Sequence, residues 1–280
     1  MATLLDFSQK IELRPLGALV DRVNEVVSDR PYLLAGATAR DLLLQHAHGI
    51  APRRATADVD LAFLIEAWDQ YLSLRANLLA SGDFTEVPGK GQHKLRFHGS
   101  FEVDLLPFGA VERNDRTIAW PPDGASMTMF GFREALSSCI TVLLPGNAHV
   151  QIVSLPALTI LKFVAWSERR MIEPGKDAHD LLLIIRNYLD AGNQERLYSE
   201  GQELLSGSPF DYEAASAWLL GKDMARLLDA RGQEKLVRLI ADEADESGAL
   251  RLIGDMRIEP ERALQFLAAL QDGFIQGTKK

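Results

Sequence analysis

Cysteine is nearly missing from the sequence, since Cys139 is the only one in 280 residues. An intrachain disulfide and a zinc site built from several cysteines are therefore both excluded. The six histidines form neither an H-x-x-x-H nor an H-E-x-x-H arrangement, which argues against a zinc hydrolase. The sequence also has no G-x-x-x-x-G-K-S/T loop and no G-x-S-x-G motif, which argues against a P-loop ATPase and an α/β-hydrolase.

Long hydrophobic runs are absent as well. The most apolar stretch, residues 155–166, is shorter than the roughly 20 residues that span a bilayer, and Lys162 interrupts it. Residues 1–10 lack a basic region followed by an apolar stretch, so we expect no secretory signal. We therefore expect a cytoplasmic protein with no membrane partner.

Positive charge is in deficit, because 30 Lys and Arg face 39 Asp and Glu and give a net charge of −9. Broad binding to nucleic acid depends on many phosphate contacts by Lys and Arg, so this balance argues against it. A local basic patch beside an acidic site is still compatible with the composition. With 47% hydrophobic and 25% charged residues, the chain can bury a real core.

The pattern of apolar residues changes along the chain. In the first part it predicts helix 16–27, strand 32–35, helix 38–44 with Thr38 as its cap, strand 59–65, helix 68–80, and strands 94–97, 101–106, 140–144 and 150–153. From residue 155 onward the spacing is helical throughout. We expect an α/β domain at residues 1–154, built on one small sheet, and a helical domain at residues 155–280 that closes one side of a cleft.

Three aspartates stand out in the first domain. Asp58 and Asp60 are two residues apart in a predicted strand, so their carboxylates should point to the same side. Such a pair is unfavourable unless it is neutralised, and Mg²⁺ with its preference for oxygen ligands can do this. Asp104 lies in another predicted strand, FEVDLL, and would complete a three-acid site if the two strands were neighbours. A lone D-x-D is usually a solvated strand edge, but the third acid favours a metal site.

The residues before these acids favour phosphate chemistry. Gly36 ends a short predicted strand and would let the backbone approach a triphosphate, while Thr38 could offer its hydroxyl and amide at a helix N-terminus. Transfer of a nucleotidyl group needs its phosphate charge neutralised, which two metal ions roughly 3.5–4 Å apart can achieve. Asp58 and Asp60 would bridge Mg²⁺ (or Mn²⁺) ions, and Asp104 would complete the site and accept the hydroxyl proton.

At these positions the sequence resembles the DNA polymerase β nucleotidyltransferase superfamily. The pattern of that superfamily is a Gly-Gly or Gly-Ser turn, an acid-x-acid strand and a later single acid. Residues 36–44 (GATARDLLL) are also similar to the opening motif of CCA-adding enzymes and poly(A) polymerases. The resemblance implies an α+β fold with a polymerase β-like sheet, flanking helices and a helical C-terminal half. It also implies nucleotide contacts from Gly36, Ala37, Thr38 and Arg40, with Ala37 departing from the usual second glycine or serine.

Two later segments, residues 161–169 (LKFVAWSER) and 176–181 (KDAHDL), resemble motifs of the AbiEii-type nucleotidyltransferases, a family of bacterial toxins and phage-defence proteins. The resemblance implies that Lys162 meets the nucleotide phosphates and that Asp177 or Asp180 lines the catalytic cleft, so both are candidate nucleotide-binding residues. From the residues alone, Lys162 must either reach solvent or meet a negative partner. Asp177 and Asp180 could equally be acids that favour a helix N-terminus.

The implied function is transfer of a nucleoside monophosphate from a nucleoside triphosphate (NTP) to a hydroxyl of RNA, such as a tRNA-like molecule, or of a protein. An antitoxin protein is an implied partner. Two alternatives stay open: a degenerate nucleotide- or partner-binding protein without turnover, and an aminoglycoside-type small-molecule nucleotidyltransferase, which the net charge of −9 permits. A CCA-adding role is disfavoured because the chain is short and acidic.

The sequence leaves one register undecided. If residues 98–100 form a three-residue turn, Lys94 and Arg96 lie on the same sheet face as Glu102 and Asp104. A two-residue turn at residues 99–100 would point both basic residues to the opposite face.

Overall fold

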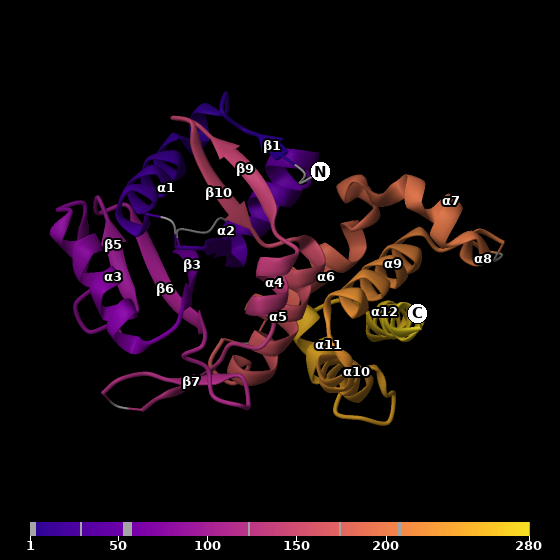
Figure 1. Cartoon of the computed structure of the whole chain (residues 1–280). Coiled ribbons are helices and arrows are strands. Elements are labelled where there is room, and N and C mark those ends of the chain that lie inside the picture. The colour runs from indigo at the N-terminus through magenta and orange to yellow at the C-terminus, as the bar shows by residue number, and fades with distance from the viewer. Residues whose placement is uncertain are drawn as a thin grey trace. The chain divides into compact units, whose positions relative to one another are not determined.

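The computed structural model describes residues 4–28, 30–52, 58–122, 124–173, 175–206 and 209–279. The chain divides into two compact units (Figure 1). The first unit consists of residues 1–47 and 51–154, and the second of residues 48–50 and 155–280.

The first unit is built on a sheet. Its strands are β1 (Leu4–Asp6), β2 (Tyr32–Ala35), β3 (Asp58–Ile65), β4 (Phe84–Glu86), β5 (Lys94–Phe97), β6 (Phe101–Gly109), β9 (Ile140–Leu144) and β10 (Ala148–Ile152). Within the described residues these strands form one mixed sheet in the order β1-β9-β10-β2-β3-β6-β5-β4. Two further strands, β7 (Thr117–Ala119) and β8 (Ser126–Thr128), pair only with each other there. The sheet is thus larger than the small one expected, because short edge strands give little sequence signal.

Helices cover this sheet. They are η1 (Ile11–Leu13), α1 (Arg14–Val27), α2 (Gly36–Asp41) with its π-helical continuation η2 (Leu42–His46), α3 (Trp68–Ala80) and α4 (Phe132–Ser137). Helix α1 begins with a proline in its first turn and buries Leu16, Leu19, Val20 and Val23, which share one helical face. It packs against α3 and the sheet (Figure 1).

The two central strands, β3 and β6, separate a buried face from a polar face. Val59 and Leu61 of β3 are at most 1% exposed, as are Val103 and Leu105 of β6. The residues that alternate with them at the start of each strand are acidic and only half-buried. Because side chains alternate across a strand, this pattern places the apolar residues in the core and the acids on the opposite face.

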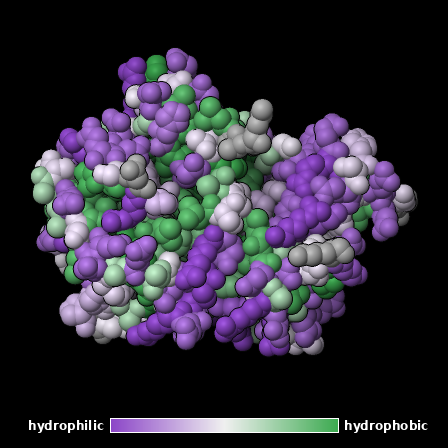
Figure 2. Space-filling model, viewed as in Figure 1, coloured by the Kyte–Doolittle hydropathy of each residue, from purple (hydrophilic) through white to green (hydrophobic). Residues whose placement is uncertain are grey.

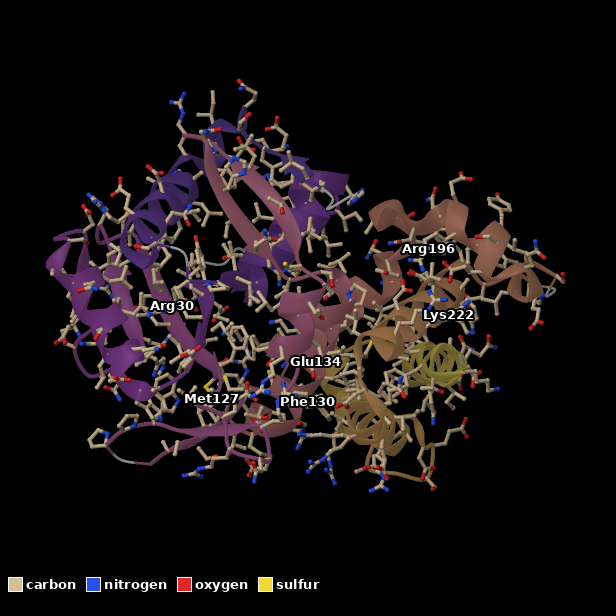
Figure 3. All side chains as sticks on the ribbon, in the orientation of Figure 1. Arg30, Met127, Phe130, Glu134, Arg196 and Lys222 are labelled. Carbon is tan, nitrogen blue, oxygen red and sulfur yellow. The ribbon has the colours of Figure 1, made fainter. Side chains whose placement is uncertain are left out.

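The β7–β8 segment is tied to α4 by a basic residue. The guanidinium of Arg116 lies 3.1 Å from the carboxylate of Glu134 and 5.9 Å from the ring centroid of Phe130. Phe130 and Glu134 are labelled in Figure 3, close to the hairpin. Arg116 thus links the β7–β8 pair to α4, in a part of the chain whose glycines, prolines and methionines give no clear periodicity.

The second unit is helical. Its helices are α5 (Leu155–Arg169), α6 (Lys176–Asn187), η3 (Leu189–Asn193), η4 (Gln194–Arg196), α7 (Leu197–Glu200), α8 (Gln202–Leu205), α9 (Tyr212–Leu227), α10 (Ala230–Ala244), α11 (Arg251–Met256) and α12 (Pro260–Thr278). Glycines let α9 and α12 approach closely: a Cβ at Gly221 would lie 2.0 Å from the carbonyl oxygen of Leu270, and one at Gly273 would lie 1.9 Å from that of Trp218. In the described residues, no helix combines the length and apolarity that a membrane crossing needs.

Ion pairs hold the outer helices of this unit together. The guanidinium of Arg196 lies 2.6 Å from Asp223 and 2.8 Å from Glu200, and the ammonium of Lys222 lies 3.4 Å from Glu200. Figure 3 labels Arg196 and Lys222 in this region, and Figure 2 shows mainly hydrophilic residues over α7 and α8. Ion pairs between charged side chains therefore connect these outer helices.

The expected α+β architecture, a sheet with flanking helices followed by a helical half, is confirmed. One local prediction is wrong: Thr38 does not cap a helix. The helix begins at Gly36, its N-cap is Ala35, and no side chain caps it. Gly36 adopts a φ of +65°, which glycine tolerates. The chain can therefore pass from β2 into α2 without a loop between them.

Candidate active site

The acids of β3 and β6 meet in register. The two strands are parallel, and Asp60 is paired with Asp104 while Asp58 is paired with Glu102. Register partners in neighbouring strands point to the same side, so these four carboxylates share one face of the sheet. Sequence reasoning assigned a site role to three of them and placed Glu102 on the face of Asp104 without giving it a role.

Two basic residues of β5 lie on this same face. In the antiparallel pair of β5 and β6, Lys94 is opposite Asp104 and Arg96 is opposite Glu102. Phe97 pairs with Phe101, so residues 98–100 form a three-residue turn, which decides the register that the sequence left open. His98 and Gly99 adopt φ values of +45° and +68° in this turn.

The basic residues form close ion pairs with the acids opposite them. The ammonium of Lys94 donates to both oxygens of Asp104, at 2.6 and 2.9 Å. Nη2 of Arg96 donates to Oε1 of Glu102 at 2.9 Å. The side chains of Lys94 and Asp104 are only 19% and 18% exposed, so solvent screens this pair less than an ordinary surface pair.

The electrostatics keep Lys94 charged. Burial alone would lower the pKa of its ammonium, but the hydrogen bond and charge of Asp104, together with the charges of Asp58 and Glu102, outweigh burial and raise that pKa. The hydrogen bond from Arg96 lowers the pKa of Glu102. The face therefore carries fixed charges of both signs at neutral pH.

Gly36 fits against Asp60 with no room for a side chain. Ala35 of β2 is the register partner of Asp60, and Gly36 follows it directly. A Cβ at Gly36 would lie 1.7 Å from Oδ2 of Asp60. The hydroxyl of Thr38 donates to the carbonyl oxygen of Asp58 at 2.9 Å. The first turn of α2 is thus fixed against the start of β3, beside both acids.

Ala37, Ala39 and Arg40 of this helix are buried. Ala37 is 6% exposed and Arg40 is 1% exposed. Nε and Nη2 of Arg40 lie 2.7 and 2.6 Å from Oδ1 of Asp41. The structure thus brings Gly36 to Asp60 and Thr38 to Asp58, and it packs Ala37 and Arg40 inside the protein.

Asp58, Asp60 and Asp104 offer the hard oxygen ligands that Mg²⁺ prefers. In the parts of the chain that the structure describes, however, no three Asp, Glu, His or Cys side chains already converge as a metal-binding group. The oxygens of Asp104 instead bind the ammonium of Lys94. A cation thus already stands beside Asp104, and the donor set suits a divalent ion.

Lys162, Asp177 and Asp180 come together inside the second unit. The ammonium of Lys162 lies 2.9 Å from Asp177 and 2.6 Å from Asp180, and all three residues are at most 5% exposed. Arg169 adds two hydrogen bonds to Asp177, at 2.7 and 2.8 Å. Lys162 therefore binds negatively charged partners and does not extend into solvent. The cluster joins α5 to α6.

This cluster predicts a defined loss of stability in acid. Burial alone would raise the pKa of Asp177, but the hydrogen bonds from Arg169 and the charge of Lys162 lower it from 3.8 to about 2. Because the folded pKa lies below the unfolded one, the stabilisation is complete above about pH 4 and disappears as the pH falls toward 2, an effect of about 2 kcal/mol. We expect the difference in unfolding free energy between wild type and Asp177→Asn, measured by urea titration, to shrink by this amount over that range.

The exposed Asp242 of α10 provides the control for this measurement, since its side chain is in solvent. Asp242→Asn should differ from wild type by the same small amount at every pH. A gap between wild type and Asp177→Asn that stays constant from neutral pH to pH values near 2 would contradict the role of the charge on Asp177.

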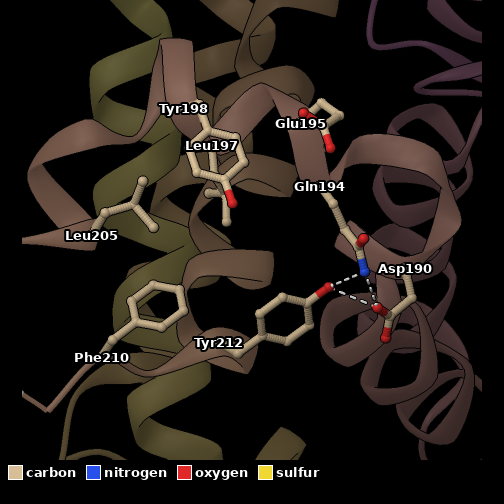
Figure 4. A pocket seen from close by; sticks show the side chains of 8 residues that line it. All are labelled: Asp190, Gln194, Glu195, Leu197, Tyr198, Leu205, Phe210 and Tyr212. Atoms are coloured by element: carbon tan, nitrogen blue, oxygen red, sulfur yellow. Dashed lines mark hydrogen bonds between the residues drawn. The ribbon is translucent and has the colours of Figure 1, made fainter.

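A hollow of about 370 Å³ lies wholly within the second unit (Figure 4). It is lined by Asp190, Gln194, Glu195, Leu197, Tyr198, Leu205, Phe210 and Tyr212. The Tyr212 hydroxyl donates to Oδ1 of Asp190 at 2.6 Å, and Gln194 donates to the same oxygen at 2.9 Å. None of the residues predicted to act in catalysis or nucleotide binding lines this hollow.

The chain is similar to known proteins in both sequence and structure. A family profile described as "Nucleotidyl transferase AbiEii toxin, Type IV TA system" matches residues 18–243. No curated protein matches significantly.

Among solved structures, the antibiotic-resistance factor ANT(2'')-Ia is 17% identical, with a TM-score of 0.38, and the match covers 69% of this chain and 98% of that one. JHP933 from Helicobacter pylori is 12% identical, with a TM-score of 0.35 and coverage of 96% and 94%. A CCA-adding enzyme in complex with ATP is 14% identical, with a TM-score of 0.21 and coverage of 95% and 82%.

Proposed function

Because this chain belongs to the AbiEii family of nucleotidyltransferase toxins of type IV toxin–antitoxin systems, we propose that it transfers a nucleoside monophosphate from an NTP to a hydroxyl acceptor with the help of a divalent metal ion. In this reaction the acceptor oxygen forms a bond to the α-phosphorus, and pyrophosphate leaves. The observation that carries the proposal is the register of β3 and β6, which sets Asp60 opposite Asp104 with Asp58 two residues away.

The three aspartates of the acidic face and Gly36 each have a role in this proposal. Asp58, Asp60 and Asp104 would hold Mg²⁺ or Mn²⁺, which when bound neutralises charge on the phosphate oxygens. Asp104 accepts the proton of the acceptor hydroxyl. Gly36 has no side chain, so the backbone at the start of α2 packs directly against the carboxylate of Asp60 and stays next to the proposed phosphate position.

The structure gives the other predicted nucleotide-binding residues supporting contacts within the fold. Arg40 and Ala37 are buried and support the helix that carries Gly36. Lys162, Asp177 and Asp180 hold α5 and α6 together through their ion pairs. Contact between these three residues and the nucleotide stays a prediction from the family resemblance.

The family also suggests the biological setting. We propose that the transfer reaction is toxic to the cell that makes the protein and that an antitoxin protein counteracts it. The acceptor is an RNA, such as a tRNA-like molecule, or a protein. We further propose that the reaction takes place in the cytoplasm, where NTPs and these acceptors are abundant.

The proposal predicts metal-dependent labelling. The purified protein, incubated with each α-³²P-labelled NTP and Mg²⁺, should transfer label to total RNA or to a protein extract. Adding EDTA in excess should reduce the label to background, and restoring Mg²⁺ should bring it back, because the metal ion neutralises the negative charge of the phosphate. The measurement is radioactivity in gel-resolved RNA and protein.

Other outcomes would select other functions. NTP binding in calorimetry without transfer to any acceptor would favour a binding protein without turnover. Label appearing only on an aminoglycoside mixture would favour a small-molecule nucleotidyltransferase. Labelling that persists unchanged in EDTA would contradict the metal requirement.

A further inference from the structure

We propose that Lys94 is a built-in cation of the acidic face, so that the site takes up one divalent ion where the same aspartates without Lys94 would take up two. The inference rests on the proposed function, because it concerns the same acids. It adds a residue that the family resemblance does not single out, and it assigns that residue a positioning role: Lys94 acts through Asp104.

The first support is geometric. Lys94 is the register partner of Asp104, so its side chain starts directly opposite the carboxylate that it binds. Its ammonium reaches both oxygens, at 2.6 and 2.9 Å, and so competes for the same lone pairs that a metal ion would use. Because the cation is covalently attached to the neighbouring strand, its local concentration at Asp104 far exceeds that of a free ion.

The second support is the charge of the face. Four carboxylates, Asp58, Asp60, Glu102 and Asp104, share it with the two cations Lys94 and Arg96. Lys94 therefore places a positive charge directly beside a predicted metal ligand, and this charge opposes the approach of a divalent ion to Asp104.

The third support is the different position of Arg96. It carries the same charge on the same strand face, but its guanidinium binds Glu102 instead of a predicted metal ligand. If Lys94 acted only through the general field of the face, Arg96 would be equivalent to it. If Lys94 occupies an ion position at Asp104, only Lys94 will exclude a metal.

The test counts Mn²⁺ ions bound per chain, by the electron paramagnetic resonance signal of free Mn²⁺ and by calorimetry, in the full-length protein without nucleotide. We expect wild type to bind one ion and Lys94→Met to bind two, with the first bound about tenfold more tightly, a change of ~1.4 kcal/mol. Lys94→Arg should restore a stoichiometry of one. The matched control, Arg96→Met, should still bind one, because it leaves the pair between Lys94 and Asp104 in place.

The possible failures are distinguishable. Mn²⁺ stoichiometry and affinity that are identical in wild type and Lys94→Met would overturn the inference and leave the proposed function standing. An equal gain in Lys94→Met and Arg96→Met would also overturn it, in favour of a general field effect. If no variant binds Mn²⁺ and labelling is metal-independent, the proposed metal site itself fails. Circular dichroism checks that each variant is folded.

Discussion

Asp60→Asn is expected to reduce nucleotidyl transfer by about a thousandfold or more, because it removes the central charge of the acidic face while keeping the shape of the side chain. Asp60 lies between two neighbouring strands. It is opposite Asp104 in β6 and next to Ala35 in β2, and the backbone of Gly36 packs against its carboxylate. The measurement is the initial rate of label transfer from the NTP at saturating Mg²⁺.

The first unit offers a matched control for this change. Asp21 is an exposed acid on α1, and Asp21→Asn makes the same chemical substitution away from the acidic face. It should label the acceptor at the wild-type rate. Thermal unfolding should show that Asp60→Asn is folded, since an amide fills the same volume. Equal labelling by Asp60→Asn and wild type would refute the metal role of Asp60.

The second large effect is expected from Gly36→Ala. The added methyl group would lie 1.7 Å from Oδ2 of Asp60, so the carboxylate or the turn must move by an ångström or more. Displacement of a reacting group by about 1 Å can reduce a rate about a hundredfold. We therefore expect transfer to fall by about that factor or more. The measurement is kcat/KM for the NTP.

The backbone contributes a separate cost that needs its own control. Gly36 has a φ of +65°, and a non-glycine residue in this conformation costs about 1–2 kcal/mol of stability. Gly82 has a φ of +82°, and a Cβ at this position would have nothing within 4 Å of it, so Gly82→Ala isolates the backbone cost. Gly36→Ala should lose more stability in urea unfolding than Gly82→Ala, because its methyl group also collides with Asp60, and only Gly36→Ala should lose activity. Comparable activity in the two would show that the contact with Asp60 is unimportant.

The departure at Ala37 from the usual glycine or serine has a structural counterpart. Ala37 is 6% exposed, so a small apolar side chain fills a buried position in the first turn of α2. The nearby hydroxyl, that of Thr38, is occupied by the carbonyl oxygen of Asp58. Thr38 therefore fixes the helix on β3, and the proposed phosphate grip depends on the backbone around Gly36.

The sequence by itself determined the fold class and the side of each strand on which the acids lie. Strand alternation has a period of two, so Asp58 and Asp60 must share a face whatever the strand's neighbours are. Helical spacing likewise identified the second half as helical, because that signal is local to each segment. The apolar residues that alternate with the acids, such as Val59 and Val103, then set which face is buried.

Only the tertiary structure decided which strands are neighbours and in what register. Hydrogen bonding between strands far apart in sequence set Asp60 opposite Asp104, and a three-residue turn brought Lys94 onto the same face. Shifting β5 by one residue would have pointed Lys94 away, with no change in its sequence pattern. The partners of Lys162 were undecided for the same reason: a buried charge requires a counter-charge, but the sequence does not say which residue supplies it.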